Sequence, residues 1–229
     1  MAERAILVTE KLTPELLLKA YAAGVFPMAQ SRDDRYVFWV DPKMRGVLPL
    51  DRFHVPRSLR KLLKKNPFEI RVNTAFDQVI AKCAEAWKNR RDTWINSEIV
   101  KAYTQLHRMG FVHSIEVWLN GKLVGGLYGV ALGGAFFGES MFSRVSGASK
   151  VALVFLVERL RAGGFKLLDT QFMTDHLRRF GAVEIPARRY LEMLEDALGA
   201  KARFYFDRAS GEVAAGLEAL FRQSKTQTS

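Results

Sequence analysis

The chain has 229 residues, of which 48% are hydrophobic and 26% are charged, a composition that excludes a disordered protein and allows one large or two small domains. Its formal net charge of +11 favours a polyanionic partner, either a nucleic acid or an anionic membrane surface. The one cysteine excludes an intrachain disulfide framework and a thiolate metal cluster.

The N-terminal segment begins with a helix signal and continues into an irregular stretch. Thr13 followed by Pro14 places a capping hydroxyl before a proline, which predicts a helix that ends at Gly24. Three prolines then predict irregular backbone over 25–50. The N-terminus is not a secretory signal, and no apolar run approaches the length of a membrane span. We therefore expect a cytoplasmic protein without a membrane partner.

A basic segment follows. Residues 52–68 include no aspartate or glutamate, and 56–65 are expected to form a short helix with leucines inward and basic side chains outward. We divide the chain at this point into a small N-terminal domain, 1–66, and a larger C-terminal domain, 67–229. The end of the chain, from about 223 to 229, is expected to be frayed.

The rest of the chain alternates strand and helix signals. Asn120-Gly121 is a strong hairpin signal between two strands, and the apolar run 151–157 predicts a buried helix. A strand meander, a buried helix, a further strand and a late helix are typical of a layered α+β fold. The expected strands are 70–72, 114–119, 122–132, 135–142 and 167–172, and the expected helices are 75–88, 98–109, 151–162 and 188–198.

Residues 125–150 combine glycines with large apolar residues and one carboxylate, Glu139. Glycines let a backbone and a ligand approach closely, at a cost in backbone entropy. A carboxylate in apolar surroundings is costly unless it is paired, hydrogen-bonded or used for a ligand. The stretch therefore predicts a pocket for a bulky apolar group with a polar end, although Glu139 could instead form a buried salt bridge with Arg144.

Several segments together resemble one family. They are GESMFSR (138–144), WINSEIVKAYTQLHRMGFVHSIEVW (94–118), LLDTQF (167–172), AAGVFPM (22–28), FWVDPKMRGVLPL (38–50) and GAVEIPARRYL (181–191). With these motifs the chain, from about Thr13 to Leu198, resembles the leucyl/phenylalanyl-tRNA–protein transferases. The resemblance implies that the C-terminal domain, which follows the small N-terminal domain, is similar to the GCN5-related acetyltransferase (GNAT-like) fold, a mixed sheet with flanking helices.

The resemblance also implies a reaction. Members of this family move leucine or phenylalanine, or methionine, from aminoacyl-tRNA to the N-terminal α-amino group of proteins that begin with arginine or lysine, which marks these proteins for degradation by the N-end rule. Because the aminoacyl ester is already activated, no metal and no cofactor are expected. The implied partners are aminoacyl-tRNA and the acceptor protein, and we expect a monomer.

Three polar residues receive roles from the resemblance. Asp169 and Gln171 lie two apart in a predicted strand, so their side chains share one face. Asp169 would orient Gln171, whose carbonyl would hold the incoming amino group. Glu139 would bind either the α-amino group of the transferred amino acid or the basic side chain of the acceptor. The amino-acid pocket would be lined by Leu127, Phe136, Met141, Ser143, Leu153, Leu156 and Leu160, each of which could instead be a core residue.

Contacts with tRNA follow from the same resemblance. Trp39 and Trp94 match family positions that hold the 3′-terminal adenosine, and Phe38 stands where the family often has a second tryptophan. Stacking on an aromatic plane contributes roughly 1–3 kcal/mol per base. The basic segment would contact tRNA phosphates without reading their sequence, through Arg57, Arg60, Lys61, Lys64 and Lys65. Core tryptophans and a solvated helix face are the alternative interpretations.

Two other functions stay open. The segment 144–149 nearly matches the pyrophosphate-binding motif R-x-x-G-x-G/A before a helix, so the chain could be an acyl-CoA-dependent N-acyltransferase of the GNAT superfamily. The charge and the tryptophans also fit a non-catalytic RNA-binding module. That second alternative leaves Glu139 and the Asp169/Gln171 pair unexplained.

Overall fold

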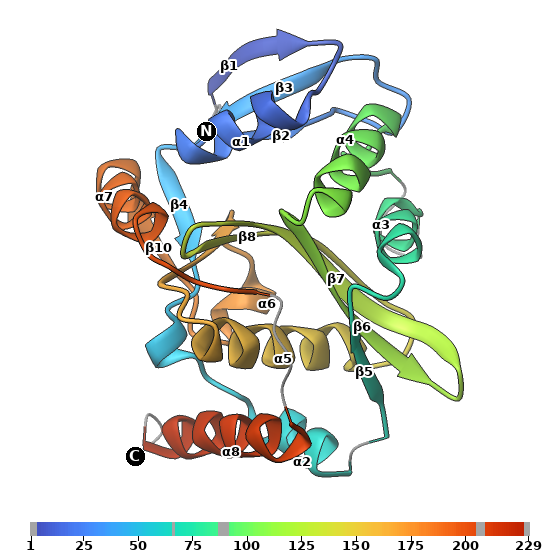
Figure 1. Ribbon diagram of the computed structural model, residues 1–229, viewed down its shortest axis with the longest axis vertical. Helices are drawn as coiled ribbons and strands as arrows, with labels where there is room; N and C mark the ends of the chain where they lie inside the picture. The colour runs from blue at the N-terminus through green and yellow to red at the C-terminus, as the bar shows by residue number, and fades with distance from the viewer. Residues whose placement is uncertain (1–3, 66, 87–91, 205–208, 227–229) are drawn as a thin grey trace.

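The strands of the protein form two sheets in the computed structural model, a small one at the top of the view and a large one below it (Figure 1). The structure describes residues 4–65, 67–86, 92–204 and 209–226. The small sheet has the order β1-β3-β2, with β1 Arg4–Thr9, β2 Phe26–Met28 and β3 Val37–Asp41. The large sheet has the order β10-β4-β9-β8-β7-β6-β5. Its strands are β4 Met44–Val47, β5 Glu69–Val72, β6 Val112–Leu119, β7 Lys122–Leu132, β8 Ala135–Ser143, β9 Leu167–Gln171 and β10 Val183–Pro186.

Helices cover both faces of the large sheet. On one face α5 runs along the sheet with α2 and α8 beyond it, and on the other lie α1, α3 and α4 (Figure 1). Phe136 and Phe137, neighbours on β8, enter different hydrophobic cores, because successive strand residues point to opposite faces. The helices are α1 Pro14–Ala22, α2 Arg57–Lys65, α3 Phe76–Ala84, α4 Ser97–Arg108, α5 Ala148–Ala162, α6 Asp175–Arg178, α7 Ala187–Leu198 and α8 Ser210–Thr226, with a 3₁₀ turn at Leu50–Arg52. The α+β class is confirmed.

Local signals placed several of these elements correctly. The Thr13 hydroxyl accepts a hydrogen bond from the Leu16 amide at 3.2 Å and caps α1, which gives way to Gly24 at φ +81°. Asn120 and Gly121 both have positive φ, 50° and 71°, as a two-residue type I′ hairpin requires. The helix expected over 75–88 is α3, which already ends at Ala84, and the last two residues of that range lie outside the described residues.

The stretch 25–50 is not irregular, as its prolines suggested, because it contains β2, β3 and β4. Pro27 is tolerated in β2 because this strand lies at the edge of the small sheet, where one side of the backbone needs no partner. Strand β4 pairs antiparallel with both β9 and β10 in the large sheet. The division expected at residue 66 therefore does not separate the two sheets.

The C-terminal segment forms a helix that the sequence patterns did not predict. The end of the chain, expected to be frayed from about residue 223, is helical as far as Thr226. The buried Ser224 hydroxyl accepts a hydrogen bond from the Val55 amide at 2.8 Å and donates one to the Leu220 carbonyl at 2.9 Å. Helix α8 is thus anchored to the segment that leads into α2.

Candidate active site

A cavity of about 520 Å³ lies where β8 and β9 separate. The two strands are parallel neighbours only as far as the pair Phe137 and Asp169, and the residues beyond this pair on each strand line the cavity. Strand β2 and helix α5 supply further apolar walls. The side chains around the cavity include Phe26, Met28, Trp94, Leu127, Met141, Phe142, Leu153, Leu156 and Phe172, with Glu139, Ser143, Thr170, Gln171 and His176 as polar members.

Glu139 is the extra residue of a β-bulge on β8. Across the ladder Tyr128 pairs with Ser140, and Gly129 pairs with Gly138, so Glu139 has no partner on β7. A bulge re-aims the side chain of its extra residue. Gly129 permits the close approach, because a Cβ there would lie 2.3 Å from the Phe137 carbonyl oxygen.

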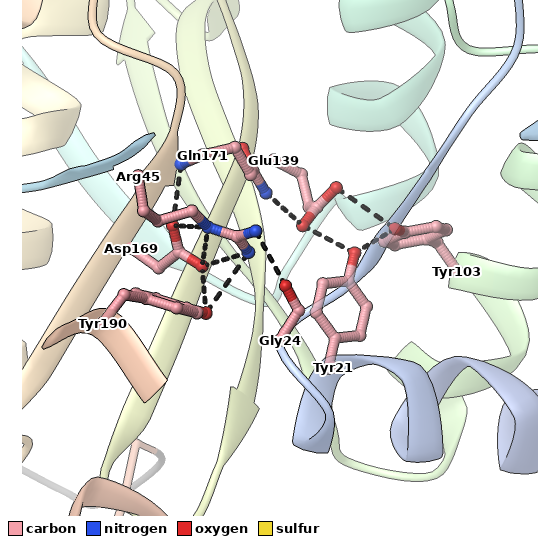
Figure 2. A network of polar contacts seen from close by, with 8 residues as sticks. All are labelled: Tyr21, Gly24, Arg45, Tyr103, Glu139, Asp169, Gln171 and Tyr190. Carbon is pink, nitrogen blue, oxygen red and sulfur yellow. Dashed lines mark hydrogen bonds and ion pairs between the residues drawn. The ribbon is translucent and has the colours of Figure 1, made fainter. Parts of the chain in front are cut away.

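Three side chains from three elements surround the Glu139 carboxyl group (Figure 2). Tyr21 on α1 donates a hydrogen bond to Oε1 at 2.7 Å, and Tyr103 on α4 donates one to Oε2 at 3.1 Å. The Gln171 side-chain amide donates to Oε1 at 2.9 Å. The two tyrosine hydroxyls also contact each other. Burial raises the pKa of Glu139 to about 7, and the two tyrosine hydroxyls oppose this shift.

Asp169 lies behind this group in a second polar cluster. Arg45 on β4 grips its carboxylate in a forked ion pair, with Nε at 3.0 Å from Oδ1 and Nη2 at 2.7 Å from Oδ2. Tyr190 donates a further hydrogen bond to Oδ2 at 2.7 Å. The Arg45 guanidinium also donates to the Gly24 carbonyl at 2.8 Å and stacks on the rings of Phe26 and Tyr190. Such a pair fixes the surrounding backbone.

Gln171 connects the two clusters (Figure 2). Its backbone amide donates to Asp169 Oδ1 at 2.7 Å, and its side-chain amide donates to Glu139. Its φ of +56° is rare for a residue other than glycine and is often associated with functional sites. Within the part of the chain that the structure describes, its side-chain carbonyl accepts no hydrogen bond, which leaves this oxygen for a ligand.

Eight of the seventeen sequence-predicted site residues meet at the cavity. Its lining includes Glu139 and Gln171 together with Trp94, Leu127, Met141, Ser143, Leu153 and Leu156. Asp169 lies just behind it, fully buried, and contacts Gln171 through the backbone. The suggested ion pair of Glu139 with Arg144 does not form, because Arg144 pairs with Glu85 instead.

Other predicted residues lie elsewhere. Phe136 and Leu160 are fully buried in the core between the sheet and α5. Trp39 is 4% exposed on β3, where it pairs with Pro27 and packs into the other core. The cations of α2 lie on its outer side, except that Arg60 is half-buried and donates to the Phe221 carbonyl.

Four site residues were missed by sequence reasoning: Tyr21, Arg45, Tyr103 and Tyr190. Each lies in a helix or strand whose pattern explains it equally well as a core or surface residue. A usable signal exists only for Arg45, because an arginine inside a short apolar strand demands an acidic partner.

Two general kinds of feature are absent from the described parts of the chain. Among residues 4–65, 67–86, 92–204 and 209–226, no group of three His, Cys, Asp or Glu side chains is placed to hold a metal ion. No helix within the same ranges is long and apolar enough to cross a membrane.

Comparisons with known proteins identify the class and then the family. The family model described as leucyl/phenylalanyl-tRNA protein transferase N-terminal domain matches residues 10–43, and the model described as leucyl/phenylalanyl-tRNA protein transferase matches residues 47–195. These matches and the cavity define an aminoacyltransferase. The chain belongs to the leucyl/phenylalanyl-tRNA–protein transferase family.

Two relatives that carry this name are similar over nearly their whole length. One from Paramagnetospirillum magneticum is 59% identical over 197 residues, which cover 86% of this chain and 93% of the relative. One from Phenylobacterium zucineum is 56% identical over 213 residues, which cover 93% of this chain and 96% of the relative.

Solved structures are more distant. The C-terminal domain of a putative lysylphosphatidylglycerol synthetase from Agrobacterium fabrum aligns with a TM-score of 0.41 and 12% identity over 82% of this chain and 63% of that chain. A likeness this low carries no argument. The acetyltransferase-like form of the large sheet stays a prediction from the family resemblance.

Proposed function

We propose that this protein transfers leucine or phenylalanine from aminoacyl-tRNA to the N-terminal amino group of proteins that begin with arginine or lysine. The observation that carries the proposal is the contact between Glu139 and Gln171 on the wall of a largely apolar cavity. Apolar walls suit a leucine or phenylalanine side chain, and the polar wall suits amino groups. The names of the relatives, leucyl/phenylalanyl-tRNA–protein transferase, support it.

The reaction is the aminolysis of an ester. The neutral amine of the acceptor attacks the ester carbonyl carbon, the new C–N bond forms, and the bond from that carbon to the ribose oxygen breaks. One proton leaves the nitrogen and one proton ends on the ribose oxygen, so the reaction balances without a redox step. The enzyme has to orient the two substrates and exclude competing water.

Glu139 and Gln171 would each bind one of the two amino groups, that of the transferred amino acid and that of the acceptor. The Glu139 carboxyl group meets the α-amino group of the transferred amino acid, while the open side-chain carbonyl of Gln171 accepts a hydrogen bond from the attacking amine. An amide carbonyl is a weak base, so Gln171 positions the amine. Asp169 has no open face toward the cavity and acts as a positioning residue, through the backbone of Gln171.

The tRNA would approach over the N-terminal end of α5. Trp94 lines the cavity and offers an aromatic plane to the terminal adenine. Helix α2 packs close to this end of α5, because a Cβ at Gly147 would lie 2.6 Å from Leu62. Its outward cations Arg57, Lys61, Lys64 and Lys65 are exposed and suit tRNA phosphates. We place the reaction in the cytoplasm, where charged tRNA is available.

The loop 144–149 is less suitable for the alternative donor, an acyl-CoA, whose pyrophosphate it would have to bind. Arg144 is already paired with Glu85, and the Ser149 amide already donates to the Ser143 hydroxyl at 3.3 Å. Two of the groups that would hold a pyrophosphate are therefore engaged.

The deciding experiment offers both donors in parallel. Labelled leucine or phenylalanine on tRNA is supplied with a peptide that begins with arginine, and acetyl-CoA is supplied to the same peptide. We expect transfer from the tRNA alone, and no transfer when the peptide begins with aspartate or is N-terminally acetylated. Acetylation, or binding of tRNA without any transfer, would overturn the proposal.

A further inference from the structure

The contacts around Glu139 need one more proton than the two tyrosines can supply. Tyr21, Tyr103 and Glu139 touch one another in a closed triangle (Figure 2). Each of the three oxygen-to-oxygen contacts needs a proton to be a hydrogen bond, and each phenol has one. Burial raises the pKa of both phenols well above the ordinary value of a tyrosine, so both hydroxyl groups stay protonated. Each hydroxyl has one proton and can donate one hydrogen bond.

If Glu139 is an anion, one side of the triangle is two oxygens in contact with no hydrogen between them. Either both phenol protons point at the carboxylate and the tyrosine hydroxyls face each other through lone pairs, or one phenol donates to the other and one phenol-to-carboxylate contact has no proton. If Glu139 is a neutral acid, every contact is satisfied. In that state the 3.1 Å contact between Tyr103 and Oε2 runs in the opposite direction, with the acid as donor and Tyr103 as acceptor. Tyr103 then donates to Tyr21, and Tyr21 donates to Oε1, which also accepts from Gln171.

We propose that Tyr21 and Tyr103 are positioning residues that hold Glu139 as a neutral carboxylic acid in the free enzyme, and that Glu139 gives up this proton when an amino group binds in the cavity. The O–H bond of the acid breaks, and the carboxylate then pairs with the ligand ammonium group. The proton goes to water if the ligand arrives as an ammonium ion, or to the ligand if it arrives as a neutral amine. The release of the proton when an amino group binds rests on the proposed function.

The charges around Glu139 agree with a neutral acid. Burial is the largest influence on Glu139 and raises its pKa to about 7, while hydrogen bonds that the two phenols donate to the carboxylate lower it. In the closed triangle only Tyr21 donates to the carboxyl group and Tyr103 accepts from it, so this lowering influence is reduced. The groups that face it are Tyr21 from α1, Tyr103 from α4 and Gln171 from β9. The charges nearby are Asp169 and Arg45, which already form their own ion pair. Among the described residues, no cation pairs with Glu139 directly, so a ligand cation would be its first.

A second glutamate provides the comparison. Glu116 is fully buried, whereas Glu139 is partly exposed at the cavity wall. Glu116 accepts hydrogen bonds from the Thr74 and Ala75 amides, both at 2.9 Å, and from the Ser114 hydroxyl at 2.8 Å. Each donor brings its own proton, so this carboxylate needs none. Glu116→Gln is therefore the matched control for Glu139→Gln.

Infrared difference spectroscopy of the free protein tests the first half. About one pH unit below the Glu139 pKa, ordinary carboxyl groups are ionised, and a neutral buried acid has a distinct carbonyl stretch. We expect this band in the wild type and in Glu116→Gln, but not in Glu139→Gln, and we expect it to vanish as pH rises through about 7. Absence of the band from the wild type, or its survival in Glu139→Gln, would overturn the proposal.

Two small probes test the second half. Leucinamide carries an amino group and no reactive ester, and 4-methylpentanamide is the same molecule without the amino group. Saturation is followed by the change in tryptophan fluorescence, to which Trp94 contributes from the cavity wall. Bound leucinamide should abolish the band, and bound 4-methylpentanamide should leave it.

The outcomes separate the two proposals. A band that persists in saturated leucinamide overturns the proton release, while the proposed function stands on its transfer assay. Failure of leucinamide to bind overturns the placement of an amino group beside Glu139, and with it the release. In the Tyr21→Phe and Tyr103→Phe variants, a purely structural role would change only stability. A positioning role moves the pH at which the band vanishes.

Discussion

Arg45 on β4 and Asp169 on β9 form a forked ion pair whose side chains are 1% and 0% exposed, 124 residues apart in the sequence. The pair joins the end of α1, through the Gly24 carbonyl, to the strand that carries Gln171. The backbone of Gln171 is therefore held by a contact made in the first quarter of the chain. Loss of either partner leaves a buried, uncompensated charge.

Arg45→Met should lower the free energy of unfolding by about 3–5 kcal/mol, the usual cost of breaking a buried ion pair from one side. Urea denaturation measures the change. Lys166→Met is the control, because the ion pair of Lys166 with Asp196 is largely exposed and should contribute far less. Equal losses in the two variants would contradict a central role for Arg45.

Gln171→Ala should lower kcat by about 100-fold and leave tRNA affinity nearly unchanged, because a misplaced amine costs rate before it costs binding. Single-turnover transfer and a tRNA binding titration separate the two effects. Gln105→Ala removes an exposed amide on α4 and serves as the control. A near-normal rate in Gln171→Ala would show that its carbonyl does not hold the acceptor.

Glu139 should make stability fall as pH rises. Its pKa in the folded protein is raised from 4.5 to about 7, so the folded state binds more protons than the unfolded state between these values, and the free energy of unfolding decreases across that window. The total effect is on the order of 3 kcal/mol. Urea unfolding at several pH values, wild type minus Glu139→Gln, isolates it.

The subtraction is necessary because His113 acts in the opposite direction. Burial lowers its pKa to about 4, so stability rises with pH between about 4 and the ordinary histidine value. Both proteins keep His113, and its contribution cancels. A pH-independent difference between them would contradict a raised pKa at Glu139.

Replacing Lys61, Lys64 and Lys65 on α2 with glutamine should flatten the salt dependence of tRNA binding. Each lost phosphate contact reduces the slope of log K against log salt concentration by about 0.7–0.9. Arginine at the same three positions keeps the charge and should keep the slope. An unchanged slope in the glutamine variant would remove α2 from the tRNA interface.

Features that depend on a few neighbouring residues were predictable from the sequence. The cap at Thr13 and the turn at Asn120-Gly121 follow from local chemistry and appear as expected. Glu139 was recognisable because a carboxylate among glycines and aromatic residues demands a reason. Trp94, Leu153 and Leu156, which line the cavity, were named through the family resemblance, as was Leu160, which lies in the core.

Features that depend on contacts between distant parts of the chain were not predictable from the sequence. Strand β4 has four residues, and its partners lie more than 100 residues away, so its short length and the flanking Pro42 and Pro49 concealed it. Tyr21 reaches Glu139 across 118 positions, and no periodicity on α1 marks it as different from a core tyrosine. Bulges such as the one at Glu139 arise from strand pairing, which the sequence of one strand does not encode.

The two parts of the chain that match separate family models do not have separate chemistry. The N-terminal part supplies Tyr21 and the Gly24 carbonyl, and its strand β2 lines the cavity. A chimaera with the N-terminal part of a relative would therefore replace the cavity wall formed by β2 and the residue at position 21, which contacts Glu139. A hybrid whose two parts do not match should therefore fold and still lose turnover.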